Sequence, residues 1–221
     1  MTKSFWAIIA IIIIVLGGIF IATSKHGGGG NNANSNAKPS SHVEGSASTG
    51  VKLVEYGDYE CPYCGQFYPI VKQVVEANKD KIQYQFVNLP LNQVHKNAFA
   101  AARAAEAASL QGKFWEMHDL LYTNQDPQGA SGWVASSDPL DEYFVGYAKQ
   151  IGLNVAKFKT DFASSSVNDT INADVAKFKK LGIEESTPAF FIDGKQIHPG
   201  YQASDFQKAI DAEIKAKTSN K

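Results

Sequence analysis

The chain has only two cysteines, and they lie three positions apart in the sequence Cys61-Pro62-Tyr63-Cys64. A run of β-branched and other apolar residues from Val51 to Tyr56 precedes the pair, and apolar residues at helical spacing follow it. We therefore expect the pair at the junction of a buried strand and a helix. A thiol in the first turn of a helix lies in the positive field of backbone N–H groups, which stabilises its thiolate, the reactive form. This arrangement indicates redox chemistry.

Two other interpretations of the pair are weaker. A disulfide stabilises mainly by restricting the unfolded chain, and a loop closed over two intervening residues restricts almost nothing. A structural zinc site usually needs four ligands. The chain has no second cysteine pair, and its five histidines are scattered without ligand spacing. We therefore expect no metal site at the pair.

The N-terminal segment is typical of a membrane anchor. Residues 5–22 are apolar and uncharged, and about 18 helical residues span roughly 27 Å, close to the ~30 Å hydrocarbon core of a bilayer. A cleaved signal peptide would have a shorter apolar region and a small-x-small cleavage site, which Phe20 and Ala22 fit poorly. We expect residues 1–25 to be an uncleaved anchor in the lipid bilayer.

The anchor divides the chain into a short head and a long C-terminal part. The positive charges on the two sides of the anchor are nearly balanced, so they do not decide in which direction it crosses the membrane. A short N-terminal head, however, favours a C-terminal part outside the cytoplasm. Residues 26–49 are rich in Gly, Asn and Ser, and we expect a flexible linker there. Residues 50–221 are enough for one domain with a core. A net charge of -1 and the absence of basic runs argue against nucleic acid as a partner.

The folded part has an α/β pattern with a long helical insertion. Strand-like runs at 51–56 and 82–87 flank one helix, which predicts a βαβ unit with parallel strands. Helical spacing then continues almost throughout, so we predict an all-helical insert over about residues 92–182. The sheet resumes at residues 188–192, and Asp193-Gly194 predicts a tight hairpin turn before the last strand and a final helix.

The spacing of the two cysteines assigns them different roles. Cys61 at the helix N-cap would be the attacking or attacked sulfur, and Cys64, one turn deeper, would resolve the mixed disulfide. Pro62 presets the backbone of the first turn. Glu60 would oppose thiolate formation if its side chain pointed inward, and we expect it on the surface.

Two further features converge on the pair. A charged side chain in a buried strand is costly unless it is neutralised or paired, so we predict that Glu55 lies beneath the helix start and relays a proton to or from Cys64. The alternative is a Glu55 that faces solvent or pairs with Lys52 or Lys72. In Thr187-Pro188, a cis bond is accessible. It would turn the Thr187 backbone toward the pair and leave its N–H and C=O free for a substrate chain.

The order of these features resembles the DsbA-like branch of the thioredoxin fold over about residues 50–217. The features of this chain that carry the resemblance are a strand with Glu55, the Cys-Pro-Tyr-Cys sequence, a helix containing Pro69, a long helical insert and Thr187-Pro188. The stretch Gln111-Gly112-Lys113-Phe114-Trp115-Glu116-Met117-His118 is similar to that branch too. The expected fold is therefore α/β and thioredoxin-like, with an inserted helical subdomain and a preceding transmembrane helix.

The resemblance also implies roles for particular residues. Cys61 would be the nucleophile, Cys64 the resolving thiol, and Glu55 the buried carboxylate. Pro188 would be the cis-proline that faces the disulfide. We expect substrate contacts at the remaining site positions, which are Pro62, Tyr63 and Thr187. An extracytoplasmic site and no dissociable cofactor are implied as well, since the Cys61–Cys64 disulfide itself carries the electrons.

One residue departs from the pattern of the best-known periplasmic members, which carry His where Tyr63 stands. A histidine there donates to the thiolate and makes the disulfide more oxidising, so we expect a less oxidising pair in this chain. Cys-Pro-Tyr-Cys is also the glutaredoxin sequence, but glutaredoxins are short and lack the helical insert.

The sequence therefore favours a membrane-tethered oxidoreductase on the extracytoplasmic side of the cell membrane. It would introduce disulfides into cysteine-containing exported proteins and be reoxidised by a membrane partner. A reductase or isomerase of the same fold stays open, because the direction of exchange depends on potential and partner. A tethered chaperone or docking module, in which the thiols are incidental, is a third alternative.

Overall fold

A computed structural model describes residues 37–219 of the chain. Five strands in this part form one sheet with the order β1-β3-β2-β4-β5. Their bounds are β1 His42–Glu44, β2 Val51–Gly57, β3 Ile82–Asn88, β4 Ala189–Ile192 and β5 Lys195–Ile197. Strands β2 and β3 run parallel, and the other neighbouring pairs are antiparallel. The predicted βαβ unit is confirmed.

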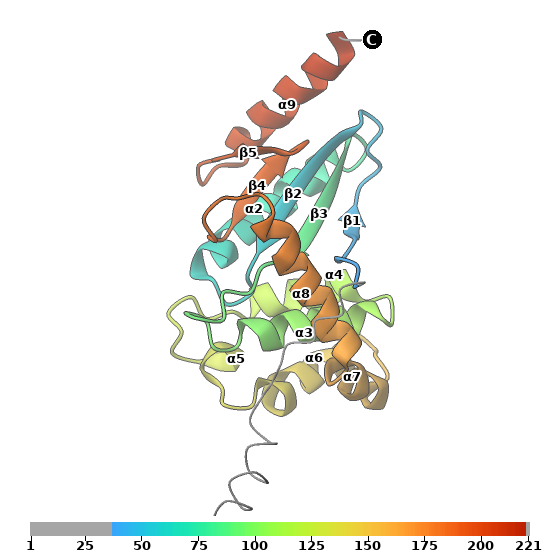
Figure 1. The fold of residues 1–221 in the computed structure, drawn as a ribbon, viewed down its shortest axis with the longest axis vertical. Helices are drawn as coiled ribbons and strands as arrows, with labels where there is room; N and C mark the ends of the chain where they lie inside the picture. The colour runs from blue at the N-terminus through green and yellow to red at the C-terminus, as the bar shows by residue number, and fades with distance from the viewer. Residues whose placement is uncertain (1–36, 220–221) are drawn as a thin grey trace, which may run out of the picture. The chain divides into compact units, whose positions relative to one another are not determined.

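The helices cover the sheet and build the insertion between β3 and β4. Those that pack against the sheet are α2 Pro62–Asn78, α8 Ser165–Lys179 and α9 Ala203–Ser219. The others are α3 Ala98–Ser109, α4 Phe114–Thr123, α5 Gly132–Ala135, the π-helical turn η2 Leu140–Phe144, α6 Val145–Gln150 and α7 Val155–Phe162. Figure 1 shows the insertion at one end of the sheet, with α8 returning from it alongside β3. The predicted helical insert is confirmed.

The two faces of the sheet bury different clusters. Successive side chains of a strand point to opposite faces. Leu53 therefore joins the main core under α2 and α9, whereas Tyr56 packs edge-to-face against Phe178 of α8 on the other side. Glu55 shares the face of Leu53, and its neighbours in the sheet are Phe86 and Phe190. This alternation directs the Glu55 side chain toward the region beneath α2.

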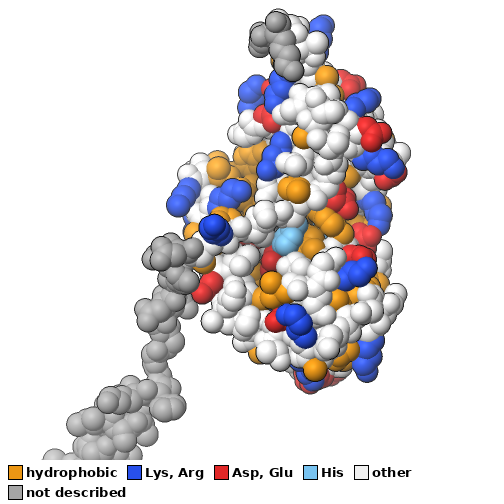
Figure 2. All heavy atoms as spheres, turned by 90° about the vertical axis from the view of Figure 1, so that its right-hand side faces the viewer, with side chains coloured by type: hydrophobic (Ala, Val, Ile, Leu, Met, Phe, Trp, Pro, Cys, Tyr) orange, Lys and Arg blue, Asp and Glu red, His pale blue; other side chains and the backbone are white. Residues whose placement is uncertain are grey.

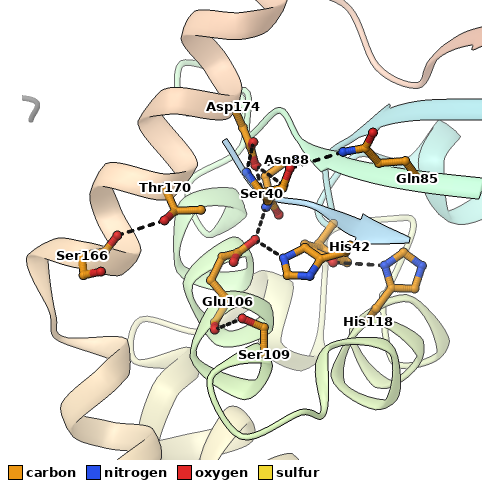
Figure 3. A network of polar contacts seen from close by, with 11 residues as sticks. Ser40, His42, Gln85, Asn88, Glu106, Ser109, His118, Ser166, Thr170 and Asp174 are labelled. Carbon is orange, nitrogen blue, oxygen red and sulfur yellow. Dashed lines mark hydrogen bonds and ion pairs between the residues drawn. The ribbon is translucent and has the colours of Figure 1, made fainter. Parts of the chain in front are cut away.

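The expected linker ends earlier than residue 49. Residues 37–49 belong to the folded part, where β1 pairs with β3. The Ser40 backbone N–H and hydroxyl each donate to the Asp174 carboxylate at 2.7 Å, and His42 Nε2 lies 2.8 Å from Glu106 Oε1 (Figure 3). The prediction failed because it relied on apolar content, while this segment is held by polar groups that need buried partners. The rest of the linker, residues 26–36, lies outside the described residues.

The described part contains no membrane-spanning candidate. No helix within residues 37–219 is long and apolar enough to cross a bilayer. The expected anchor, residues 1–25, lies outside the described residues.

On the face drawn in Figure 2, the described Lys and Arg side chains are interspersed with Asp and Glu.

Candidate active site

The structure brings the two cysteines to the start of α2. Cys61 is the N-cap residue, with extended backbone (φ -66°, ψ 121°), and Pro62 occupies the first helical position. Cys61 is 4% exposed and Cys64 is fully buried. Tyr63 between them is 56% exposed. Both sulfurs are free thiols, so the structure shows the dithiol state.

The surroundings of Cys61 favour its thiolate. The pKa of Cys61 is lowered from 9.0 to about 6, chiefly because the Cys64 thiol hydrogen-bonds to it. The Thr187 side chain and the backbone N–H groups of Cys64 and Tyr63 act in the same direction, and burial acts against them. The helix N-terminus therefore contributes as predicted, but the neighbouring thiol contributes more. At pH 7, such a pKa leaves most of Cys61 as thiolate.

Cys64 is held in the opposite state. Burial raises its pKa well above 9.0, and the hydrogen bond with Cys61 and the Cys61 charge raise it further. The Asp58 backbone N–H donates to Cys64 Sγ at 3.5 Å. In the dithiol form, one sulfur is therefore reactive and the other keeps its proton.

The segment before β4 closes over Cys61. The Thr187-Pro188 peptide bond is cis, as predicted. Cys61 Sγ lies 3.4 Å from the Thr187 carbonyl oxygen. Among the described residues, the buried Thr187 hydroxyl oxygen has no hydrogen-bond partner while Cys61 is a thiol, so the hydroxyl is available as a donor to the thiolate.

Glu55 lies in the core, 2% exposed. The Tyr84 hydroxyl donates to Glu55 Oε2 at 2.7 Å. Burial raises the pKa of Glu55 from 4.5 to about 7, and the bond from Tyr84 opposes that rise. The alternative of a solvent-facing Glu55 is wrong, and Lys72 pairs with Asp119 instead. A cavity of about 520 Å³ between α2 and α4 reaches Glu55 and Tyr84.

The prediction that Glu60 lies on the surface is wrong. Glu60 is only 9% exposed, and its Oε2 accepts the backbone N–H of Asn97 at 2.5 Å, at the start of α3. Local sequence could not show this, because the partner lies 37 positions away. Burial is the main reason why the pKa of Glu60 is raised.

Sequence reasoning also missed Asp58 and Tyr84. Asp58 is a buried acidic residue in the turn just before Cys61, and its position three residues ahead of the pair was a usable signal. Tyr84 lies on β3, and nothing in its local pattern marks it as the partner of Glu55. Among residues 37–219, no three His, Cys, Asp or Glu side chains gather as metal ligands would.

Comparison with known sequences places this site in a family. A family model described as Thioredoxin matches residues 37–212. A protein named Na(+)/H(+) antiporter NhaA 1, from Salinispora arenicola, is 38% identical over 169 residues, which are 76% of this chain and 24% of that protein. The chain thus spans about a quarter of the length of the curated relatives it matches.

Solved structures show the same fold. A thioredoxin-like oxidoreductase from Silicibacter pomeroyi is 26% identical with a TM-score of 0.61, over 79% of this chain and 92% of that one. The alpha-DsbA1 protein of Wolbachia pipientis is 20% identical with a TM-score of 0.65, over 82% and 94%. At that lower identity the likeness concerns the fold alone. The chain belongs to the thioredoxin family, with the DsbA-like fold in which a helical insertion separates β3 from β4.

Proposed function

We propose that the protein is a membrane-tethered thiol–disulfide oxidoreductase that introduces disulfides into cysteine-containing exported proteins. The observation that carries the proposal is the asymmetry of the two thiols. The pKa of Cys61 is lowered to about 6, whereas that of Cys64 is raised. A stabilised thiolate favours the reduced pair, so the corresponding disulfide accepts electrons more readily than an unperturbed one.

The reaction has two thiol–disulfide exchanges. A substrate thiolate attacks Cys61 of the oxidised pair, the Cys61–Cys64 bond breaks, and a mixed disulfide forms. Cys64 leaves and takes up a proton. A second substrate thiolate then attacks the substrate sulfur of the mixed disulfide, and Cys61 leaves as a thiolate. The substrate loses two electrons and the pair gains them.

Glu55 is the proposed source of the proton for Cys64. A general acid works best when its pKa lies near the working pH, and the pKa of Glu55 is about 7. The charges of Glu55 and Cys64 interact, since Glu55 is among the groups that raise the pKa of Cys64. The cavity that reaches Glu55 offers its carboxyl group a route for recovering a proton from solvent.

Substrate chains would bind across the surface that surrounds Cys61. The Thr187 carbonyl already lies against Cys61 Sγ, and a substrate backbone N–H would replace that contact. The exposed ring of Tyr63, next to Pro62, and the half-buried Pro188 would complete the surface. No dissociable cofactor enters this reaction.

The cellular setting follows from the sequence and remains part of the proposal. Residues 5–22 would cross the lipid bilayer once and hold the catalytic domain on the extracytoplasmic side of the cell membrane. A membrane redox partner would reoxidise Cys61 and Cys64 after each cycle.

The test is the oxidative refolding of a reduced, disulfide-containing substrate by the full-length chain. We expect the wild type to accelerate refolding. A Cys61→Ser variant and a Cys64→Ser variant should both be inactive, because neither can form the Cys61–Cys64 disulfide that oxidises the substrate. A Cys61→Ser variant as active as the wild type would refute the proposal.

The redox state of the pair in cells decides the direction of exchange. A pair that is mostly disulfide supports the oxidase. A pair that is mostly dithiol indicates the reductase or isomerase. Function that survives replacement of both cysteines would indicate a chaperone or docking module.

A further inference from the structure

The turn between β2 and α2 is organised around the buried carboxylate of Asp58. Its Oδ1 accepts the Glu60 N–H at 2.8 Å. Its Oδ2 accepts the Leu91 N–H at 2.9 Å and lies 2.7 Å from His95 Nδ1. Leu91 and His95 belong to the loop that connects β3 to α3. The carboxylate therefore ties the active-site turn to a loop more than 30 positions away in sequence.

The backbone of Asp58 contacts both cysteines. Its carbonyl oxygen accepts the Cys61 N–H at 3.1 Å, and its N–H donates to Cys64 Sγ at 3.5 Å. A movement of Asp58 would therefore displace both sulfurs. The loop that holds the Asp58 carboxylate helps to set the geometry of the redox pair.

An unpaired charge on Asp58 would work against the chemistry of Cys61. A buried carboxylate is costly unless it is paired, and a negative charge near a thiol disfavours its thiolate. Among the described residues, His95 is the one side chain that forms an ion pair with Asp58. The Asp58 side chain is fully buried, whereas that of His95 is 18% exposed. The imidazole can therefore exchange a proton with solvent while it holds the carboxylate.

The acidic groups around His95 favour its protonated form. Its pKa is raised, first by the hydrogen bond with Asp58 and then by the charges of Asp58, Cys61 and Glu60, while burial opposes the rise. The adjacent Lys96 directs its ammonium group to the Ala135 carbonyl oxygen at 2.9 Å.

We propose that His95 is a positioning residue of the redox pair, which fastens the Asp58 turn and, when protonated, provides the positive charge that stabilises the Cys61 thiolate. The inference rests on the proposed function, because it concerns the same two sulfurs. His95 gains and loses no electrons in this role. By reciprocity, the Cys61 thiolate holds the His95 proton more tightly in the dithiol form than the disulfide does.

The first test replaces His95 with asparagine in the full-length chain. Asparagine in H95N keeps an N–H donor near the position of Nδ1 but carries no charge. The matched control is H198N, since His198 is exposed and lies outside the active-site turn. The alkylation rate of Cys61 against pH and the equilibrium with glutathione are measured for all three proteins.

For H95N we expect the alkylation midpoint to rise by about one pH unit. The equilibrium constant for oxidation of glutathione by the pair should fall about fivefold at pH 7, where the wild-type thiol is largely ionised and the variant thiol about half ionised; this corresponds to about 20 mV. The difference from wild type should shrink at higher pH, because the wild-type histidine loses its own charge once the pH passes its raised pKa. H198N should match the wild type. A H95N variant with unchanged midpoint and equilibrium overturns the inference.

A second measurement on the wild type keeps the inference testable where H95N does not fold. The ring resonances of His95 are titrated by NMR in the reduced and in the oxidised protein. We expect a higher pKa of His95 in the reduced protein, and equal values overturn the inference. If the wild type shows this coupling but does not oxidise substrates, the proposed function fails and the inference stands. If the wild type oxidises substrates without the coupling, only the inference fails.

Discussion

Replacing Glu55 with glutamine should stabilise the protein at neutral and alkaline pH. In the folded, reduced protein the pKa of Glu55 is about 7, against 4.5 for the unperturbed group. Between these two values the folded state binds one proton more than the unfolded state, so the free energy of unfolding falls as pH rises. At about 1.4 kcal/mol per pH unit, the total loss is on the order of 3 kcal/mol. Glutamine in E55Q has no proton to lose and can still accept the bond from Tyr84.

The assay is urea unfolding of wild type and E55Q from pH 4.5 to 8.5, with the cysteines kept reduced. The difference in unfolding free energy between E55Q and wild type should increase by about 3 kcal/mol over this range, nearly all of it below pH 7 to 7.5. Other titrating groups are common to both proteins and cancel in the difference. E76Q is the control, because Glu76 lies exposed on α2, and its difference from wild type should stay nearly flat. A flat difference for E55Q would show that Glu55 ionises without cost in the folded protein.

Three further predictions concern reactivity and packing. Alkylation of Cys61 in the reduced wild type should follow a single ionisation near pH 6, and a midpoint near 8.5, the value for an ordinary thiol, would contradict the electrostatics of the site. G57A should lose about 1–3 kcal/mol of unfolding free energy, because an added Cβ at Gly57 would lie 2.4 Å from the Phe86 ring. G146A in α6 should gain about 0.5–1 kcal/mol, because an added Cβ there would meet no atom within 4 Å beyond its chain neighbours and the backbone of its own helix. Thermal unfolding compares the two, and equal shifts would refute the packing argument. D174N should lower the free energy of unfolding in urea by about 2–4 kcal/mol. The amide N–H group of the asparagine would face the Ser40 N–H and hydroxyl, whose hydrogen bonds the Asp174 carboxylate now accepts. A loss below about 0.5 kcal/mol would count against a stabilising role for this network.

Elements with a local pattern were predictable from sequence. Strand β2 is a largely apolar run that includes Lys52 and Glu55, and β3 alternates apolar residues with Gln83 and Gln85. The Asp193-Gly194 turn has positive φ at both residues, 47° and 82°, as a tight hairpin turn requires. Edge strand β1 carries no such pattern. Its one aliphatic residue, Val43, is 41% exposed, and the segment is held by a bond from Ser40 to Asp174, 134 positions away. Polar contacts over such separations leave no periodicity in the sequence.

The sequence by itself determined that two thiols stand at a strand-to-helix junction with a carboxyl group six residues ahead of them. That follows from side-chain periodicity and from the spacing of Glu55, Cys61 and Cys64, which are local properties of the chain. Only the tertiary structure decided what surrounds the sulfurs. Thr187 reaches Cys61 across 126 positions, and His95 reaches Asp58 across 37. The physical reason is that buried polar groups must find partners, and the packing of distant segments decides which partners are available.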